Sequence, residues 1–366
     1  MTEIRPLKRE DLDEVAHLYE LVMREGAPTP PPFLVGFFEQ TLLDHPWADP
    51  EISSLVCRTE GGELIGFLGS NTRRMRFDGQ PIRMGCCAHL LTHPRARNRA
   101  VVGAQLVRTY FAGPQELTIT DGATEAVRRM WEAVGGQTVH ASCLTFVQPF
   151  RPWQLASGRL AERFGYGLDT VLGPISRGLD AGTARIFGRA LRLAEPEGTV
   201  EALTPQAMLE HLPVVSESLR LRPDYDAKYL KWLFGVLADV EEWGTLWERG
   251  VRRGPLWAQL VRRYGRVLGW YVCHLRRGGF CRLLQLAASD REVGTVFDHL
   301  AYQSMQAGAA GLYGRLEPRL VGPLSERRTW VRFHEGRLVA YSPREEIVSS
   351  ILSGKALLTR LDGEWW

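Results

Sequence analysis

The residues best suited to chemistry are three arginines that alternate along a short stretch, Arg95, Arg97 and Arg99. They follow an apolar run at 82–94 that lacks helical spacing, so we expect a buried strand there. They precede residues 100–111, whose apolar spacing predicts a helix. A basic turn at a helix N-terminus offers free backbone N–H groups and positive charge. The pattern therefore predicts a site for phosphate or pyrophosphate, although any surface strand-turn-helix unit can carry such a turn.

The stretch 92–100 resembles the acyl-CoA segment of the GNAT acetyltransferase superfamily, which runs V-x-P-x-x-R-G-x-G-x-G/A between a strand and a helix. Pro94 and Arg97 match that spacing. Val102 stands where a small residue is usual, and a side chain there limits close approach of the backbone, so we expect it to crowd the pyrophosphate. The resemblance implies that acyl-CoA contacts Leu91, Thr92, Arg97, Asn98, Arg99, Ala100, Val101, Val102, Gly103, Ala104 and Trp131.

A second segment strengthens this resemblance. In the family, the helix after the fifth strand often reads A-x-x-x-Y-x-x-x-G-F, and here Ala126, Trp131 and Gly135 occupy a similar frame. Trp131 stands at the tyrosine that many members use as general acid toward the CoA thiolate. An indole N–H cannot release a proton at a useful pH, so the resemblance leaves Trp131 only a packing role against the pantetheine arm.

Acyl transfer to an amine also requires a polarised carbonyl and a base. The resemblance assigns the first to backbone N–H groups near Leu91 and Thr92. The base candidates are His89, Asp121 and Glu125. A histidine on an apolar strand is more often a satisfied core residue, and an aspartate before a helix often caps it.

Two further features bear on the acceptor. The family places its acceptor near residues 33–43, so Phe33, Phe37 and Phe38 are candidate substrate contacts, with core packing as the commoner fate of such aromatics. In some tandem relatives the terminal carboxylate reaches the active site, which makes the segment 363–366 a further candidate. The alternative there is that its two tryptophans cover an apolar surface.

Composition excludes several classes of protein. The net charge of +3 over 366 residues is too small to indicate nucleic acid. The charged N-terminus does not fit a signal peptide, and no apolar run is long enough to span a bilayer. The 6 cysteines form no C-x-x-C pair, so neither a zinc site nor a redox motif is expected. These features predict a cytoplasmic protein with reduced thiols, without a metal, acting as a monomer or homodimer.

The order of predicted elements divides the chain into a domain at 1–150, a linker at 151–198 and a domain at 199–366. In the first domain we expect strands at 3–7, 54–58, 63–70, 75–77, 82–92, 116–120 and 138–147, and helices at 12–22, 33–43, 100–111 and 124–134. In the second we expect strands at 200–203, 254–262, 267–275, 280–287 and 311–316, and helices at 205–219, 224–237 and 293–306.

The second domain therefore repeats the order of the first, but its turn reads Ala-Ser-Asp-Arg-Glu at 288–292. No glycine pair is present, and an acid stands where phosphate would lie. The resemblance implies a tandem GNAT protein of the α/β class. Each domain would have a mostly antiparallel mixed sheet flanked by helices, and only the first would bind acetyl-CoA or another acyl-CoA.

Two functions fit this sequence. The first is an N-acyltransferase, most simply an N-acetyltransferase, that moves an acyl group from acetyl-CoA to an amine of a small-molecule acceptor. The second is a GNAT-fold binding or scaffold protein without turnover. Pro94 and Arg97 favour the first function, whereas Trp131, Ala100 and Val102 favour the second.

Overall fold

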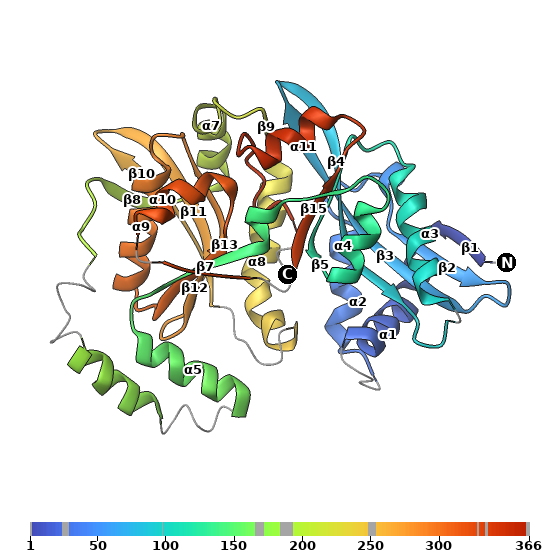
Figure 1. Ribbon diagram of the computed structural model, residues 1–366, viewed down its shortest axis with the longest axis horizontal. Coiled ribbons are helices and arrows are strands. Elements are labelled where there is room, and N and C mark those ends of the chain that lie inside the picture. The colour runs from blue at the N-terminus through green and yellow to red at the C-terminus, as the bar shows by residue number, and fades with distance from the viewer. Residues whose placement is uncertain are drawn as a thin grey trace.

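The computed structural model describes residues 2–23, 29–96, 98–164, 172–183, 193–247, 254–327, 329–333 and 336–363. Two mixed sheets form the body of the molecule, and helices flank each of them (Figure 1). The two-sheet α/β architecture expected from the order of predicted elements is therefore confirmed. Figure 1 also shows the C-terminal end of the chain between the two halves, while the N-terminus lies at the outer edge of the first sheet.

The first sheet has the order β1-β2-β3-β4-β5-β15-β6, with a short strand, β9, pairing with β3. Helices α1 and α2 share one apolar core with it, and helices α3 and α4 share another on the opposite face. The strands are β1 (Thr2–Pro6), β2 (Leu55–Thr59), β3 (Leu64–Phe77), β4 (Gln80–Thr92), β5 (Leu117–Ala123), β6 (Gln137–Thr138), β9 (Leu221–Pro223) and β15 (Arg337–Tyr341). The helices are α1 (Leu12–Met23), α2 (Pro32–Phe38), which continues as a π-helical turn (Glu39–Leu43), α3 (Arg99–Phe111) and α4 (Glu125–Glu132).

The second sheet has the order β14-β7-β13-β12-β11-β10-β8. Helices α7 and α8 share its core on one face, and α9 and α10 share its core on the other. The strands are β7 (Leu144–Pro149), β8 (Thr199–Ala202), β10 (Leu256–Arg263), β11 (Arg266–Leu275), β12 (Phe280–Ala288), β13 (Gly311–Arg315) and β14 (Trp330–Phe333). The helices are α7 (Pro205–Val215), α8 (Ala227–Trp247), α9 (Val293–Gln306) and α10 (Val321–Ser325), and α11 (Glu345–Leu352) follows β15 and packs on the first sheet.

Each sheet receives strands from the other half of the sequence, and β9 is one of those that the first sheet receives. Strand β7 follows the first-sheet strand β6 in the chain, yet it pairs antiparallel with β13 and β14 of the second sheet. Strand β15, from the C-terminal end of the chain, pairs with β5 and β6 of the first sheet. Figure 1 shows β7 among the C-terminal strands and β15 beside β5. Each half of the sequence therefore completes the sheet of the other.

The structure differs from the predicted strands at two places. The single strand expected at 138–147 is interrupted by a 3-10 turn (His140–Cys143), where the chain crosses from one sheet to the other. The expected strands at 63–70 and 75–77 form one continuous strand, β3. The polar residues between them, Asn71 to Arg74, suggested a break, but Asn71 and Arg73 are buried inside the molecule.

The β3–β4 connection follows its predicted turn chemistry. Asp78 and Gly79 have φ angles of +48° and +79°, which places both in the left-handed region. Aspartate tolerates this region and glycine favours it, so the pair forms a tight hairpin turn. This turn fixes the register of the long β3–β4 hairpin, from which the central strand of the candidate site extends.

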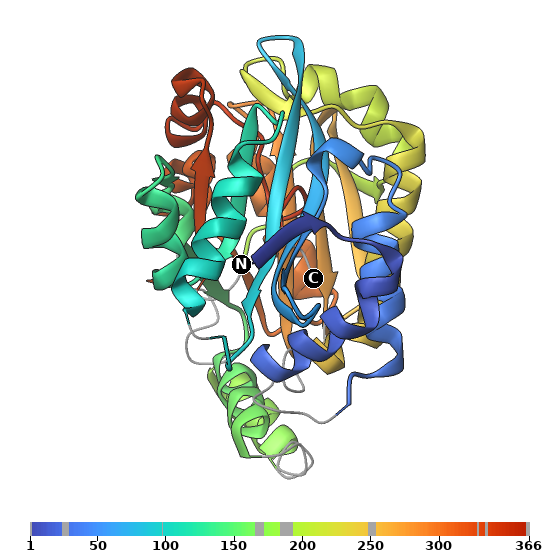
Figure 2. The same ribbon diagram turned by 90° about the vertical axis from the view of Figure 1, so that its right-hand side faces the viewer.

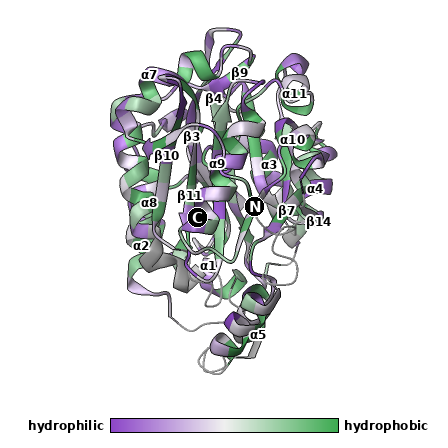
Figure 3. Cartoon of the chain, turned by 90° about the vertical axis from the view of Figure 1, so that its left-hand side faces the viewer, coloured by the Kyte–Doolittle hydropathy of each residue, from purple (hydrophilic) through white to green (hydrophobic). Residues whose placement is uncertain are grey.

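The connector between the halves contains helix α5 (Pro152–Phe164) and a further helix at 172–183. Asp180 accepts hydrogen bonds from the backbone N–H groups of Trp153 and Gln154 at 3.0 and 3.1 Å, so the second helix caps the start of α5. Figures 2 and 3 show α5 at one end of the molecule, beyond the edges of both sheets.

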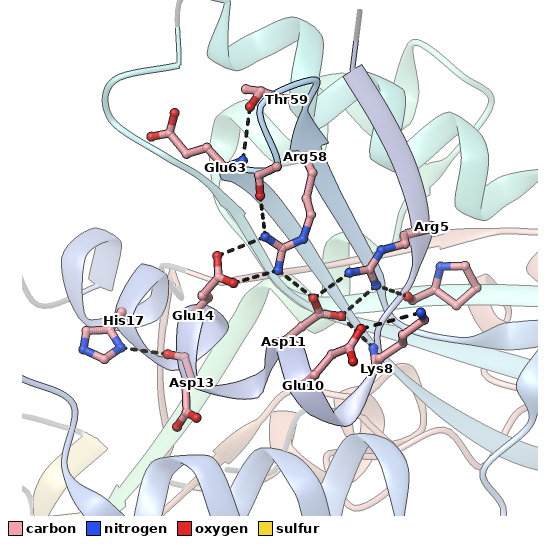
Figure 4. Close-up of polar contacts among 12 residues, drawn as sticks. Arg5, Lys8, Glu10, Asp11, Asp13, Glu14, His17, Arg58, Thr59 and Glu63 are labelled. Carbon is pink, nitrogen blue, oxygen red and sulfur yellow. Dashed lines mark hydrogen bonds and ion pairs between the residues drawn. The ribbon is translucent and has the colours of Figure 1, made fainter.

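A buried carboxylate fixes the start of the first domain (Figure 4). Asp11 is 1% exposed and forms ion pairs with Arg5 at 2.7 Å and Arg58 at 2.6 Å. Arg58 also bonds Glu14 on α1. Burial disfavours ionisation of Asp11, but hydrogen bonds from Arg5, the Lys8 backbone and Arg58 outweigh it and hold the pKa of Asp11 well below its usual range. Strands β1 and β2 are thereby joined to α1.

All the cysteines are buried and free. Within the described ranges, no group of three or more His, Cys, Asp or Glu side chains is arranged to hold a metal ion. Among the helices that the structure describes, none is both long enough and apolar enough to cross a bilayer.

Candidate functional site

The site forms where the two central strands of the first sheet separate. Strands β4 and β5 run parallel and pair only at Met84–Leu117, Gly85–Thr118 and Cys86–Ile119. Beyond Cys86 both strands continue, but they no longer pair with each other. The backbone groups that would join them are therefore directed into the gap between the strands, which is where a ligand can reach them.

A β-bulge reshapes β4 at this gap. The register with β3 passes from Phe67–Leu91 to Gly69–Ala88, so β4 contains one extra residue there. His89 lies at this irregularity with a φ angle of +53°, an uncommon conformation for a residue other than glycine. Bulges redirect side chains and free backbone groups from the ladder.

A cavity of about 130 Å³ occupies the gap. Its wall comes from both separated strands, from α3 and α4, and from the end of α1. The lining residues are Met23, Leu68, Cys87, Ala88, His89, Leu90, Leu91, Val107, Thr120, Gly122, Ala123, Thr124, Val127 and Trp131. The wall is mainly apolar, as expected for the channel of a thioester arm.

Helix α3 begins beside this cavity. Asn98 is its N-cap residue and provides no side-chain cap, and the first turn contains no acidic residue. Its first N–H groups therefore remain available to an anion. Arg97 lies outside the described residues, so its predicted contact with the pyrophosphate stays a prediction, as do the contacts predicted for Arg99, Ala100 and Ala104. Val101 is 51% exposed.

Val102 does not point toward the expected phosphate position. Its side chain is buried in the core beneath α3, directed at Gly66 on β3, where any added Cβ would collide with it. This buried position does not favour the expectation that Val102 crowds the pyrophosphate, which stays a prediction. The helix places this residue on its sheet-facing side, and Gly66 provides the space for it. Gly103 instead faces the end of β4, with Thr92 and Leu90 nearby.

Trp131 lies on the cavity wall, and its predicted packing against pantetheine stays a prediction. It is 1% exposed, and its ring packs edge-to-face against Phe111 with centroids 4.7 Å apart. Phe111 in turn stacks on Tyr341 at 4.4 Å. Because Tyr341 belongs to the exchanged strand β15, the C-terminal half of the sequence supports this wall.

The two predicted catalytic residues lie in different environments. His89 is half-buried on the cavity wall, with its ring edge-on to Tyr19 at 5.2 Å and to Phe38 at 5.8 Å. Burial lowers the pKa of His89 to about 4. The imidazole is therefore neutral at pH 7 and presents a weak proton acceptor to the cavity.

Asp121 forms an ion pair with the second half of the molecule. Its carboxylate lies 2.9 Å from Arg315 on β13 and 3.7 Å from Arg360. The backbone at Gly363 passes so close that a side chain there would collide with this carboxylate. Thr124, not Asp121, caps α4, since its hydroxyl accepts from the Val127 N–H. Asp121 thus joins the gap between β4 and β5 to the C-terminal segment.

The remaining candidate site residues are not among those that line the cavity. Glu125 is paired with Arg128 at 2.6 Å and Arg129 at 2.9 Å on the outer face of α4. Phe37 is 1% exposed and packs in the core of α1 and α2. Phe33 is half-buried. Residues 364–366 lie outside the described residues.

Sequence reasoning did not single out two buried polar residues. Asn71 and Arg73 are 0% and 1% exposed, and they lie on the face of β3 that α8 of the second half covers. Their signal was a polar run between the strands predicted at 63–70 and 75–77, for which no structure was predicted. The apolar wall residues Cys87, Leu90 and Val127 carry no sequence signal that separates them from core.

A family model agrees with this geometry. Residues 3–115 match the model described as "Acetyltransferase (GNAT) domain". The matched residues include β1 to β4 and α3, and so one of the two strands that border the gap and the basic turn, but not β5. No curated protein sequence matches the chain.

Solved structures share the fold of the whole chain. A protein of Enterococcus faecalis V583, described as a probable N-acyltransferase, has a TM-score of 0.55 and 10% identity, covering 97% of this chain and 74% of that one. A GCN5-related N-acetyltransferase from Anabaena variabilis has a TM-score of 0.53 and 10% identity, covering 94% and 74%. N-myristoyltransferase of Saccharomyces cerevisiae, solved with myristoyl-CoA, has a TM-score of 0.50 and 10% identity, covering 93% and 77%.

Proposed function

We propose that this chain, a tandem GNAT protein with a GNAT domain at residues 3–115, is an N-acyltransferase that uses acetyl-CoA or another acyl-CoA. The acyl group would pass to an amine of a small-molecule acceptor. Support comes chiefly from one observation: β4 and β5 separate beside the uncapped start of α3 and enclose an apolar cavity. Pantetheine would lie in that cavity, with the pyrophosphate at the start of α3.

The chemistry assigned to this site has three steps. Backbone N–H groups freed near the bulge, between His89 and Thr92, would polarise the thioester carbonyl. The acceptor nitrogen would then attack the carbonyl carbon and lose a proton, and the carbon–sulfur bond would break to release the CoA thiolate. Of the three predicted bases, His89 lines the cavity, whereas Asp121 is engaged by Arg315 and Arg360, and Glu125 by Arg128 and Arg129. We therefore assign the proton acceptor to His89, acting directly or through water.

Binding and turnover test this proposal separately. Acetyl-CoA at about 100 times its dissociation constant should stabilise the folded protein by about 2.7 kcal/mol and raise its melting temperature. Thiol release from acetyl-CoA, measured over a panel of amines, should reveal acceptor-dependent turnover. Absence of any stabilisation by acetyl-CoA or longer acyl-CoAs would contradict the proposal.

Trp131 supports the second candidate, a CoA-binding protein without turnover. It stands where a general acid is usual, and one general acid contributes about 10²–10⁴ to a rate. Trp131→Tyr should raise thiol release by up to about 10², because a phenol can protonate the thiolate. Trp131→Phe is the matched control, since it changes the packing without adding an acid. Rapid turnover by the wild type, unchanged in Trp131→Tyr, would show that another group supplies the proton.

The division into 1–150, 151–198 and 199–366, with the second domain not binding CoA, remains part of this proposal. We also propose a cytoplasmic location, which the buried free thiols favour. The protein is further proposed to be a monomer or homodimer that depends on neither metal nor nucleic acid.

A further inference from the structure

Arg73 is a buried cation that interacts electrostatically with the buried Asp362 but is only partly hydrogen-bonded within the described residues. It is 1% exposed, and its Nη1 donates to the carbonyl of the adjacent Thr72 at 3.1 Å. Its Nε and Nη2 atoms are buried and have no hydrogen-bond partner in the part of the chain that the structure describes. The guanidinium carbon lies 5.8 Å from the centre of the Tyr229 ring. Burying a charge that is only partly hydrogen-bonded is costly, so such an arrangement persists where it serves a purpose.

Two neighbours of Arg73 also have buried polar atoms without hydrogen-bond partners among the described residues. Asn71, two residues earlier on the same face of β3, is 0% exposed, and both atoms of its amide lack partners among the described residues. The Tyr229 hydroxyl, from α8, is also buried without a partner there. Buried polar atoms are nearly always hydrogen-bonded. Five orphaned atoms on three adjacent side chains therefore mark a binding site.

We infer that this cluster binds a carboxylate carried by the acceptor, an inference that rests on the proposed acyltransferase function. Nε and Nη2 form the side-on edge of a guanidinium, whose two parallel N–H bonds match the two oxygens of a carboxylate. Asn71 and Tyr229 add donors beside that edge. The nearby carboxylate of Asp362 does not take this role, because its oxygens accept from Tyr225 and Thr359.

The walls of the cluster favour a carboxylate over a phosphate. Trp47 stacks on Tyr229 with ring centroids 3.5 Å apart. His45 is 4% exposed, and burial, followed by the charge of Arg73, lowers the pKa of His45 to about 3, so it is neutral at pH 7. Arg73 is thus the charge that faces the ligand, and it balances a monoanion better than a dianion.

The position of the cluster also indicates the length of the acceptor. In the sheet register, Asn71 lies opposite Cys86, the last residue of β4 that pairs with β5, and Arg73 lies opposite Met84. Gly69 lies opposite Ala88, next to the bulge. Four strand residues from Gly69 to Arg73 span about 13 Å at ~3.3 Å each. The acceptor must therefore hold its amine several bonds away from its carboxylate, as an ω-amino carboxylate or a short peptide does and glycine does not.

A graded acceptor series tests this inference on the full chain. Thiol release from acetyl-CoA is measured with ω-amino carboxylates from glycine to aminooctanoate, each beside the alkylamine of the same length. We expect kcat/KM to rise with chain length through aminooctanoate, the longest of the series, and to exceed that of the matched alkylamine by about 10- to 100-fold, the usual value of a charge-assisted bond. Equal rates for carboxylates and alkylamines would overturn the inference while leaving the acyltransferase proposal intact.

Variants of Arg73 separate a ligand site from a structural role. Arg73→Met should abolish the preference for carboxylates and raise KM for aminohexanoate about 10- to 100-fold, with a smaller effect on the matched alkylamine. Arg73→Lys should recover only part of the preference, because an ammonium lacks the side-on edge. Arg76→Gln is the matched control and should behave as wild type. It removes an arginine that lies on the same strand as Arg73 but is half-exposed and paired with Asp224.

Thermal unfolding provides the readout that does not depend on turnover. Without acceptor, Arg73→Met should melt at or above the wild-type temperature, since it removes a buried charge that is only partly hydrogen-bonded. Aminohexanoate, added with CoA, should raise the melting temperature of the wild type but not of Arg73→Met. A destabilised Arg73→Met protein that keeps its preference for carboxylates would show that ordered water satisfies the cluster and would overturn the inference. Failure of acetyl-CoA itself to bind would instead contradict the proposed function.

Discussion

The two sheets have the same strand order when the second is followed from β8 to β14, so that β12 and β13 correspond to β4 and β5. Their central gaps nevertheless differ. In the first, β4 and β5 separate beyond Cys86 around a cavity. In the second, β12 and β13 pair only at 280–282 and 311–313, and β12 has its own bulge at Leu284. There, however, the Leu284 carbonyl accepts a hydrogen bond from the Leu361 N–H at 3.2 Å. The chain's own C-terminal segment thus uses the backbone that corresponds to the edge of the first sheet at which we propose that the ligand binds.

The turns before α3 and α9, which lie at these gaps, also differ in their charge. The turn before α3 is basic and leaves the helix start uncapped. The turn before α9 contains Asp290, paired with Arg319 at 3.4 Å and Lys355 at 3.6 Å, and Glu292, paired with Arg263 at 3.1 Å. An anion at the second turn would meet fixed negative charge. The comparison indicates that the second half has become a support for the first, and the following experiments test that division of roles.

The largest effect should come from breaking the ion pair between the halves. Asp121→Asn leaves Arg315, whose side chain is 2% exposed, without its carboxylate. Removing one partner of a buried pair costs about 3–5 kcal/mol. We expect that loss in the free energy of unfolding, measured with urea, together with loss of acceptor-dependent turnover.

A surface pair of similar geometry is the control. Asp78 and Arg220 lie 2.6 Å apart but are 48% and 45% exposed, so Asp78→Asn should cost at most about 1 kcal/mol. The double variant Asp121→Leu with Arg315→Met should regain most of the stability, because an apolar pair removes both buried charges. Equal losses for Asp121→Asn and Asp78→Asn would show that the halves do not depend on this contact.

The next effect concerns the two turns. Arg97→Ala should weaken acetyl-CoA binding by about 1.5–3 kcal/mol, the value of a charge-assisted hydrogen bond. Arg291→Ala, the matched change in the second turn, should leave the affinity unaltered. Isothermal titration calorimetry measures both. If Arg291→Ala weakens binding as much as Arg97→Ala, the second domain also holds CoA and the contrast drawn between the turns is wrong.

A smaller effect tests the buried orientation of Val102. Its side chain is buried against Gly66, so Val102→Gly should lower the free energy of unfolding by about 2 kcal/mol through lost burial and helix propensity. The exposed neighbour provides the control, since Val101→Gly should cost under about 1 kcal/mol. Neither change should alter acetyl-CoA affinity appreciably. Tighter binding by Val102→Gly would support the view that this residue crowds the phosphates.

The smallest effect concerns the residues that stabilise the start of each domain. The first begins at Asp11, whose pKa is held low by Arg5 and Arg58 despite burial, whereas the second begins at Thr204, which caps α7. A depressed carboxyl pKa stabilises the fold above the unfolded value of about 3.9, and this contribution is lost as the pH falls through the folded pKa. Asp11→Asn should therefore flatten the fall in stability below about pH 4.

Thr204→Ala should instead cost about 1 kcal/mol equally at pH 7 and pH 3, because a hydroxyl cap does not titrate. Urea midpoints at the two pH values measure both variants. An Asp11→Asn protein whose stability falls with acid as steeply as that of the wild type would assign the acid sensitivity to other carboxylates.

Much of the local structure follows from short-range pattern. Helix α9 spans the predicted residues 293–306, and the Asp78–Gly79 turn forms the predicted hairpin, because periodicity and turn chemistry act within a few residues. The acyl-CoA turn was predicted for the same reason, since its charge and its proline lie next to each other in the chain. The direction of the Val102 side chain was not, because the space made by Gly66 lies on another strand.

The sequence by itself determined the two-sheet α/β class and the tandem order of elements, and it predicted the basic turn before α3 as the place for CoA. Only the tertiary structure decided which sheet β7 and β15 join, because both are short apolar strands that could pair equally well with either edge. It also decided that Asp121 meets Arg315 and that Asn71 and Arg73 are buried together against Tyr229. Those contacts join residues far apart in the chain, so they depend on how the two halves pack and not on any local pattern.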